Sequence, residues 1–188
     1  MRKHIIKNII KNIYWMVYSK TISNPELPSQ IMSILFVCKG NICRSPFAEH
    51  FASKHFTVSN PLLYYSAGIQ VGNSIPPPKE AIASANKFGI DLHDHKSRQI
   101  NYKLLESYDI IVVMDTWQYT YLRRKFRKFK NKIILLPLFE NNNRTSLSSY
   151  YIHNINDPYG KNVIEYNECY TRIENCLTGL FSAINSDK

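Results

Sequence analysis

The chain is poor in acidic residues, and this shortage sets its electrostatic character. Its 14 Asp and Glu side chains stand against 24 Lys and Arg side chains, so the formal net charge is +10. Such an excess of positive charge suits anionic partners, including phosphorylated substrates, nucleic acids and anionic membrane surfaces. Charge alone does not choose among these partners, so the choice depends on motifs.

Cysteine is also scarce, and its spacing excludes two classes of site. The four cysteines stand at positions 38, 43, 169 and 176, which is not the disulfide framework of a small secreted domain. No paired Cys or His spacing typical of zinc accompanies them, so we expect no metal. Cys169 and Cys176 share a helical stripe with Leu177 and Leu180, which predicts core positions. A reducing cytoplasm is the expected location.

Short apolar runs alternate with longer helical patterns along most of the chain. This alternation predicts an α/β fold, with a four-stranded parallel sheet flanked by helices on both faces. In such sheets, ligands bind at the carboxyl ends of the strands. The 188 residues suit one such domain. The predicted strands are 34–37, 62–66, 110–113 and 133–136, and the predicted helices are 46–56, 78–88, 99–106, 116–129 and 161–184.

The segment from Cys38 to Ser45 lies between the first predicted strand and the first predicted helix. The backbone N–H groups of such a turn and helix start attract an anion. Arg44 can hold two phosphoryl oxygens at once, while Cys38 can attack phosphorus as a thiolate. Ser45 can donate to that thiolate as it leaves, and Gly40 permits a backbone angle that a side chain would resist. The expected phosphate-binding loop comprises Lys39, Gly40, Asn41, Ile42, Cys43, Arg44 and Ser45.

Asp157 supplies the second half of a catalytic pair. A phosphate ester that is cleaved by a thiolate needs an acid for the leaving oxygen and then a base for water. One carboxyl group on a loop, fixed by Pro158, can serve in both steps. Asp-Pro is also a common turn pair, so it gains meaning only beside the cysteine loop. We expect the polar segment 141–149 to be the loop that brings Asp157 over the site.

Several short segments follow one another in the order typical of a known family. They are Val37–Pro46, Ser66–Gly68, His95–Ile100, Met114–Asp115 and Asp157–Tyr159. The chain resembles the low-molecular-weight protein tyrosine phosphatases over residues 33 to the C-terminus. The resemblance implies that Cys38 is the nucleophile, that Arg44 binds the phosphoryl group and that Asp157 is the general acid and base. It also implies no cofactor, and a supporting set of Asn41, Ser45, Ser66 and His95 that holds the loop in a strained shape.

The expected substrate cleft departs from vertebrate members of this family. Those members carry an aromatic residue shortly after Ser-Ala-Gly, whereas residues 69–75 contain none here, as in bacterial members. The implied cleft residues are Tyr159, Ile69 and Val71. The implied partner is a phosphotyrosine protein, with a bacterial tyrosine kinase that controls surface polysaccharide production as one candidate.

Two other functions share a cysteine loop of this type. An arsenate reductase has the same loop and fold, but it needs further cysteines in the middle of the chain, and none lies between Cys43 and Cys169. A catalytically idle phosphotyrosine-binding module is the other alternative. The presence of Cys38, Arg44 and Asp157 together argues against it. Aryl phosphate hydrolysis and thiol-dependent arsenate turnover separate the three functions.

Residues 1–31 precede the expected catalytic domain of residues 32–188 as a basic amphipathic extension. Apolar residues recur at helical spacing between Ile5 and Val17, with basic residues around them and no acid before Glu26. We expect this extension to pack on the domain or on a second copy. Contact with an anionic membrane surface is the less favoured alternative, and a mis-assigned start codon is a third. The sequence does not determine the oligomeric state.

The run Arg123–Lys130 is the densest group of cations in the chain. One hypothesis is that it docks an acidic or multiply phosphorylated tail. The interleaved Phe126 and Phe129 also fit nucleic-acid binding. A solvated helix end, where cations are favoured, is the plainest interpretation and the one we prefer. We therefore expect no nucleic-acid partner.

Cys43 follows Cys38 across the same loop, which raises the prospect of redox control. A reactive thiolate is prone to oxidation, and a neighbouring thiol can trap it as a reversible disulfide. The alternative is that Cys43 only packs beneath the loop. The sequence favours neither.

Overall fold

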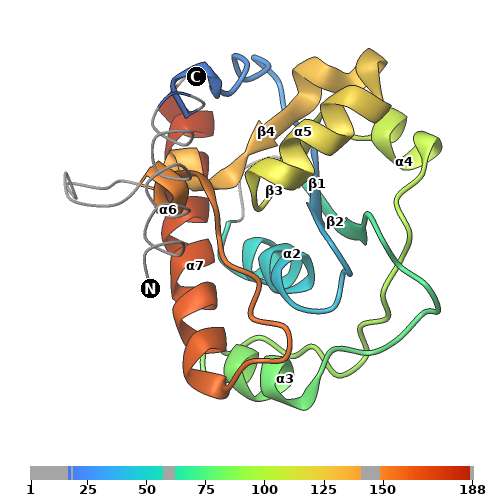
Figure 1. The fold of residues 1–188 in the computed structure, drawn as a ribbon, viewed down its shortest axis with the longest axis vertical. Helices are drawn as coiled ribbons and strands as arrows, with labels where there is room; N and C mark the ends of the chain where they lie inside the picture. The colour runs from blue at the N-terminus through green and yellow to red at the C-terminus, as the bar shows by residue number, and fades with distance from the viewer. Residues whose placement is uncertain (1–16, 18, 57–61, 141–148, 187–188) are drawn as a thin grey trace, which may run out of the picture.

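A four-stranded parallel sheet forms the centre of the fold (Figure 1). The computed structural model describes residues 17, 19–56, 62–140 and 149–186. The strands run in the order β2-β1-β3-β4, and every neighbouring pair is parallel. The predicted α/β fold with a four-stranded parallel sheet is therefore confirmed. The strands are β1 Ser33–Cys38, β2 Leu63–Gly68, β3 Ile110–Val113 and β4 Ile133–Leu135.

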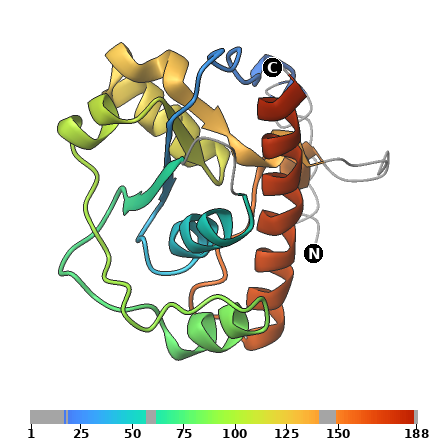
Figure 2. The same ribbon diagram turned by 180° about the vertical axis from the view of Figure 1, so that it is seen from behind.

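Helices cover both faces of the sheet, and β1, β3 and β4 are therefore buried along their whole length. Side chains alternate between the two faces: Phe36 and Val112 pack with α2, α3 and α7, while Leu35 and Ile111 pack with α4 and α5. Figures 1 and 2 show the two layers from opposite sides. The helices are α2 Arg44–His55, α3 Lys79–Asn86, α4 Tyr102–Ser107, α5 Thr116–Lys125, α6 Ser149–His153 and α7 Val163–Ser186.

The helix predicted over 116–129 is interrupted in the structure. α5 ends at Lys125, because Phe126 takes φ −119° and ψ 60°, outside the helical region. The chain continues as the 3₁₀ helix η2 (Arg127–Lys132), which turns Phe129 into the core. Two further 3₁₀ helices are η1 (Ser19–Thr21) and η3 (Leu136–Phe139).

Two other predicted boundaries can be compared with the structure. α4 begins at Tyr102 rather than at 99, because the side chain of Asn101 accepts the N–H of Leu104 and caps the helix there. The segment predicted as a loop, 141–149, lies almost wholly outside the described residues. Only its last residue, Ser149, is described, as the start of α6.

The long helix α7 packs its apolar stripe against α2, α3 and the sheet. Cys169 and Cys176 are both buried there, so their predicted core positions are confirmed. Gly179 lets α7 approach η3 closely. A Cβ atom at Gly179 would lie 1.8 Å from the carbonyl oxygen of Phe139, so only glycine fits without a backbone shift.

The chain before β1 runs along the outer edge of β4. The side chain of Asn24 accepts the N–H of Leu135 at 2.6 Å and donates to its carbonyl at 3.1 Å. Ser23 accepts the hydroxyl of Tyr119 at 2.7 Å, and Ile31 is buried in the core. The amphipathic helix expected around residues 5–17 lies outside the described residues, except for Val17. Among the described helices, none is long and apolar enough to cross a membrane.

Candidate active site

The thiol of Cys38 lies at the base of the loop that joins β1 to α2. Cys38 is the last residue of β1 and is only 3% exposed. The backbone N–H of Asn41 points at its Sγ from 3.2 Å, and the hydroxyl of Ser45 donates to Sγ at 3.0 Å. Since α2 begins at Arg44, the loop also ends at the positive end of a helix dipole. All three features stabilise negative charge on the sulfur.

Asn41, and not Gly40, carries the unusual backbone conformation of the loop. Asn41 has φ 55°, whereas Gly40 is absent from the positive-φ residues. A Cβ atom at Gly40 would make only ordinary contact, 3.6 Å from the side chain of Ile42. The expectation that Gly40 supplies a special backbone angle was therefore wrong. Asparagine tolerates the left-handed region better than most residues, because its short amide can bond locally.

The amide of Asn41 joins the supporting residues that the family resemblance implied. Its Nδ2 donates to the hydroxyls of Ser45 at 3.0 Å and Ser66 at 2.8 Å. Its Oδ1 accepts the backbone N–H of Arg98 at 2.9 Å. The ring Nε2 of His95 lies 2.9 Å from the carbonyl oxygen of Asn41. The predicted supporting set therefore converges on the one strained residue of the loop.

Glu49 extends this hydrogen-bond network, and its role was not predicted from the sequence. Its Oε2 accepts the hydroxyl of Ser66 at 2.5 Å and lies 3.6 Å from Nη2 of Arg98. Burial raises the pKa of Glu49, although the bond from Ser66 and the charge of Arg98 oppose that effect. Glu49 stands four residues after Ser45 in α2, and this spacing places both side chains on one face of the helix.

Arg44 is held between two carboxylates and a carbonyl. Its Nη1 donates to Asp115 at 3.0 Å and to the carbonyl of Ile155 at 3.1 Å. Its Nη2 forms an ion pair with Oδ2 of Asp157 at 2.7 Å. Its Nε is buried and has no partner in the described part of the chain. Burial alone would lower the pKa of Arg44, but the negative charges around it, led by Asp157, raise that pKa above its ordinary value. The guanidinium is therefore charged, and its Nε can still bind an acceptor.

Asp115 is a second functional residue that the sequence analysis did not assign. Besides binding Arg44, it caps α5, because its Oδ1 accepts the N–H of Gln118 at 2.8 Å. Its position carried a usable signal. It lies two residues after the end of β3, and the carboxyl ends of parallel strands share one edge of the sheet.

A cavity of about 170 Å³ opens above the thiol. Of the predicted cleft residues, Tyr159 lines this cavity. Ile69 is buried in the core instead, and Val71 is not among the lining residues. Gln70, from the bend that follows β2, lines the cavity in their place. The lining residues are Cys38, Lys39, Gly40, Ile42, Cys43, Arg44, Gln70, Asp157 and Tyr159.

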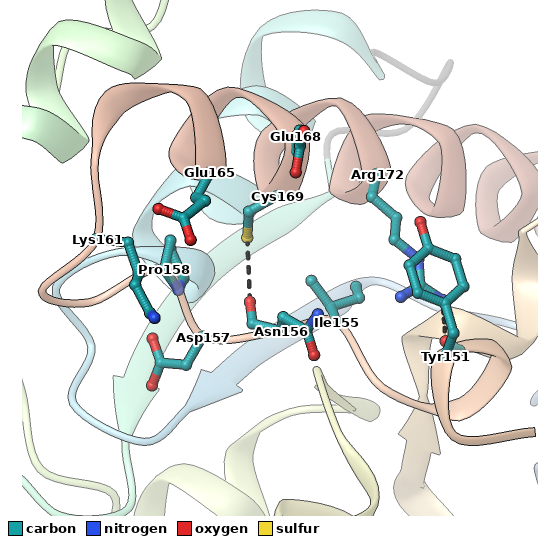
Figure 3. A pocket seen from close by; sticks show the side chains of 10 residues that line it. All are labelled: Tyr151, Ile155, Asn156, Asp157, Pro158, Lys161, Glu165, Glu168, Cys169 and Arg172. Carbon is teal, nitrogen blue, oxygen red and sulfur yellow. Dashed lines mark hydrogen bonds between the residues drawn. The ribbon is translucent and has the colours of Figure 1, made fainter. Parts of the chain in front are cut away.

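A second cavity, of about 420 Å³, lies behind the loop that carries Asp157 (Figure 3). From α7, Arg172 reaches into this region and donates to the carbonyls of Tyr151 and Asn154, both at 2.5 Å. The Sγ of Cys169 donates to the carbonyl of Asn156 at 3.5 Å. These bonds hold the loop against α7, and Asp157 lines both cavities.

Cys43 packs beneath the loop and against α7. Its Sγ lies 3.6 Å from the hydroxyl of Tyr166, and burial raises the pKa of its thiol. This placement supports the alternative that Cys43 packs beneath the loop. Disulfide trapping of an oxidised Cys38 stays a prediction.

One group of side chains in the described ranges brings metal-ligand atoms together. The donor atoms of Glu49, His50 and His95 lie within 4.8 Å of one another. Glu49 already binds Ser66, and Nδ1 of His95 faces Nη2 of Arg98 at 3.5 Å. A positive guanidinium at that distance opposes a cation, so the donor set fits a metal ion poorly.

Comparison with known proteins agrees with this geometry. The family described as "Low molecular weight phosphotyrosine protein phosphatase" matches residues 33–188. The Wzb low molecular weight protein-tyrosine-phosphatase of Escherichia coli K12 is 30% identical, over 83% of this chain and 97% of its own. The tyrosine phosphatase AmsI of Erwinia amylovora superposes with a TM-score of 0.71 at 26% identity, over 85% of this chain and 98% of its own.

A third similar protein widens the range of chemistry found on this fold. The YwlE arginine phosphatase of Geobacillus stearothermophilus superposes with a TM-score of 0.69 at 22% identity, over 82% of this chain and 94% of its own. At that identity the likeness shows the fold alone. The match over residues 33–188 and the 30% identity to Wzb carry the assignment. The chain therefore belongs to the low molecular weight phosphotyrosine protein phosphatase family.

Proposed function

We propose that this protein hydrolyses phosphotyrosine in proteins through a cysteinyl-phosphate intermediate. One observation carries the proposal. A buried thiol that accepts two hydrogen bonds faces a buried arginine with a spare donor, and a carboxylate stands opposite. A phosphoryl dianion would satisfy the unpartnered Nε of Arg44, which otherwise costs free energy as a buried donor without a partner.

Substrate binding would rearrange the contacts of Arg44. Its Nη2 is occupied by Asp157 at 2.7 Å, and its Nε is unpartnered. A phosphoryl group would take both donors as a bidentate pair and release the carboxyl of Asp157 toward the leaving oxygen. Asp115 and the carbonyl of Ile155 would keep the guanidinium in place through Nη1.

The chemistry then proceeds in two displacements. The thiolate of Cys38 attacks phosphorus in line, the bond to the tyrosyl oxygen breaks, and Asp157 gives its proton to that oxygen. Asp157 next takes a proton from water, which attacks phosphorus and returns the thiolate. Arg44 and the loop amides hold the equatorial oxygens throughout. The hydroxyl of Ser45 stabilises the departing sulfur in the second step.

The cavity suits an aromatic phosphate ester. Ile42 and Tyr159 provide apolar surface beside the thiol, and Tyr159 is largely exposed at the rim. A phenyl ring can pack between such walls. We take the physiological substrate to be a phosphotyrosine protein. A bacterial tyrosine kinase of surface polysaccharide production is the candidate, supported by the bacterial origin of relatives such as Wzb.

A cytoplasmic location follows from the same proposal. The nucleophile must stay reduced, and all four cysteines are free thiols in the structure. A reducing compartment maintains that state.

Two variants test the proposed chemistry. Cys38→Ser should abolish turnover of a phosphotyrosine peptide. Asp157→Asn should lower kcat by about 10²- to 10⁴-fold for that peptide, and far less for para-nitrophenyl phosphate, whose leaving group needs no proton. Steady-state and burst kinetics with both substrates measure this difference.

The controls are an exposed carboxylate elsewhere and a second phosphoamino acid. Asp91→Asn should leave both rates unchanged. Full activity in Cys38→Ser would refute the nucleophile. Turnover of a phosphoarginine peptide above that of the phosphotyrosine peptide would refute the substrate class.

A further inference from the structure

A cationic groove lies at the end of α5 that is remote from the active site. It encloses about 280 Å³, and four cations line it: Arg123, Arg124, Arg127 and Lys130. We call these four residues, with the hollow between them, the cationic groove. None of its lining residues is acidic.

No acidic side chain in the described ranges neutralises the charges of the cationic groove. Every acidic residue of the chain except Asp187 lies in the described ranges, and none of them forms an ion pair with the four groove cations. By contrast, the neighbouring Lys128 pairs with Glu106 at 2.8 Å. Four mutually repelling cations around one hollow create a strong attraction for an anion.

A solvated helix end does not account for the arrangement. The helix dipole favours the cations of the last turn of α5, which are Arg123, Arg124 and Lys125. Arg127 and Lys130 lie beyond that helix, in η2. The backbone of Lys130 accepts Nη1 of Arg123, and the guanidinium of Arg123 lies over the ring of Tyr119. The groove is thus built from two elements that are tied together.

The aromatic residues of this segment are not available for nucleic-acid stacking. Phe129 is 3% exposed and belongs to the core, and Phe126 packs against the same cluster. Binding of single-stranded nucleic acid relies on exposed aromatic faces beside the cations. Tyr119, the one aromatic among the described residues that line the groove, is 7% exposed and lies under the guanidinium of Arg123. The groove therefore offers guanidinium groups rather than a stacking surface, which suits compact phosphate groups.

We propose that the cationic groove docks an acidic, phosphorylated segment of the protein substrate while the target phosphotyrosine occupies the active site. The inference rests on the proposed function. α5 connects the two places, because its cap Asp115 binds Arg44 and its last turn supplies Arg123 and Arg124. A ten-residue helix is about 15 Å long. An extended peptide covers that distance in about five residues.

A pair of peptides tests the docking. One carries phosphotyrosine and, about five to seven residues away, a phosphoserine; the other has unmodified serine at that position. The parent enzyme should show a KM about tenfold lower for the doubly phosphorylated peptide, with little change in kcat. The variant Arg124→Glu/Arg127→Glu should lose this advantage and show a weaker salt dependence. It should hydrolyse para-nitrophenyl phosphate at the parent rate.

The matched control reverses two exposed lysines outside the groove. Lys87→Glu/Lys103→Glu makes the same change in net charge and should keep the preference for the phosphoserine peptide. Equal losses in both double variants would mean that net charge acts alone, and the docking proposal would be wrong. No preference in the parent enzyme would also overturn it. So would tighter binding of the groove to a single-stranded oligonucleotide or to anionic vesicles than to the peptide.

Failure of docking and failure of the proposed function give different results. An inactive parent enzyme with para-nitrophenyl phosphate refutes the function itself. Docking is then measured directly, by fluorescence anisotropy of the labelled doubly phosphorylated peptide with the parent and the Arg124→Glu/Arg127→Glu variant. Equal affinities for these two proteins refute the docking.

Discussion

Asn41 combines an unfavourable backbone conformation with favourable side-chain hydrogen bonds. Its backbone takes φ 55°, which disfavours most side chains, yet its amide makes three of the hydrogen bonds that hold the phosphate-binding loop. Glycine would relieve the backbone and lose the bonds, whereas alanine would lose the bonds and keep the backbone cost. The two effects can therefore be separated by substitution.

We predict that Asn41→Ala destabilises the protein more than Asn41→Gly, by about 1 kcal/mol, because only alanine resists the left-handed backbone. Both variants should lose kcat by at least about tenfold, because the loop loses its amide network. Urea unfolding and steady-state kinetics with para-nitrophenyl phosphate measure the two effects. Equal unfolding free energies would show that the backbone angle costs nothing.

The residues of the site divide by how far they could be inferred from the sequence. Cys38, Arg44 and Asp157 could be predicted from the sequence, because phosphate-ester cleavage needs a thiol, a guanidinium and a carboxyl group in such segments. Glu49 and Asp115 were not, since their roles depend on which side chains the folded chain brings beneath Ser66 and beside Arg44. Local spacing does not reveal such long-range contacts, although the edge position of Asp115 gave a hint.

At the scale of elements, the close approach of α7 to η3 depends on one glycine. A Cβ atom at Gly179 would overlap the carbonyl oxygen of Phe139, and backbone atoms cannot swing away as a side chain can. The two elements would have to separate to accept any side chain. α7 also carries Arg172, which fastens the loop of Asp157, so this packing reaches the site.

Gly179→Ala should therefore lower the free energy of unfolding by about 1 to 3 kcal/mol, as overpacking usually does. Thermal and urea unfolding measure the loss. Gly72→Ala is the matched control, because a Cβ atom there has no neighbour within 4 Å and the φ angle is not positive. An equally small effect at both positions would contradict the packing argument.

Strands and helices differed in how well the sequence predicted them. The four strands could be predicted from the sequence, because short apolar runs indicate buried parallel strands. The end of α5 was not, since the charges from Arg123 to Lys130 continue a helical pattern that the chain leaves at Phe126. The helix ends there because Phe129 packs into the core, and such tertiary packing overrides local helix propensity.

At the scale of the whole molecule, the segment before β1 protects an open sheet edge. β4 is an edge strand, and exposed strand edges invite pairing with other chains. Asn24 satisfies both backbone groups of Leu135, and Ile31, just before β1, is buried in the core. The expected division at Met32 stays a prediction, and these contacts bear on where the folding unit begins.

We predict that removal of residues 1–31 destabilises the protein by on the order of 3 kcal/mol relative to removal of residues 1–20. The longer deletion loses the burial of Ile31 and the bonds of Asn24 to the edge. It should also aggregate more readily, because the edge of β4 becomes free to pair. Urea unfolding and light scattering of the two truncated proteins measure both effects. Identical behaviour would place the start of the folding unit at Met32.

The order of the site residues along the chain has a consequence for protein synthesis. Cys38 and Arg44 belong to β1 and α2, whereas Asp157 and α7 lie near the C-terminus. During translation, the segment with Cys38 and Arg44 therefore emerges from the ribosome before Asp157 is synthesised and before α7 can pack on α2. Domains fold as units once enough chain has emerged. Phosphatase activity thus begins only when translation is nearly finished, and an interrupted chain carries the nucleophilic cysteine without the acid that turnover requires.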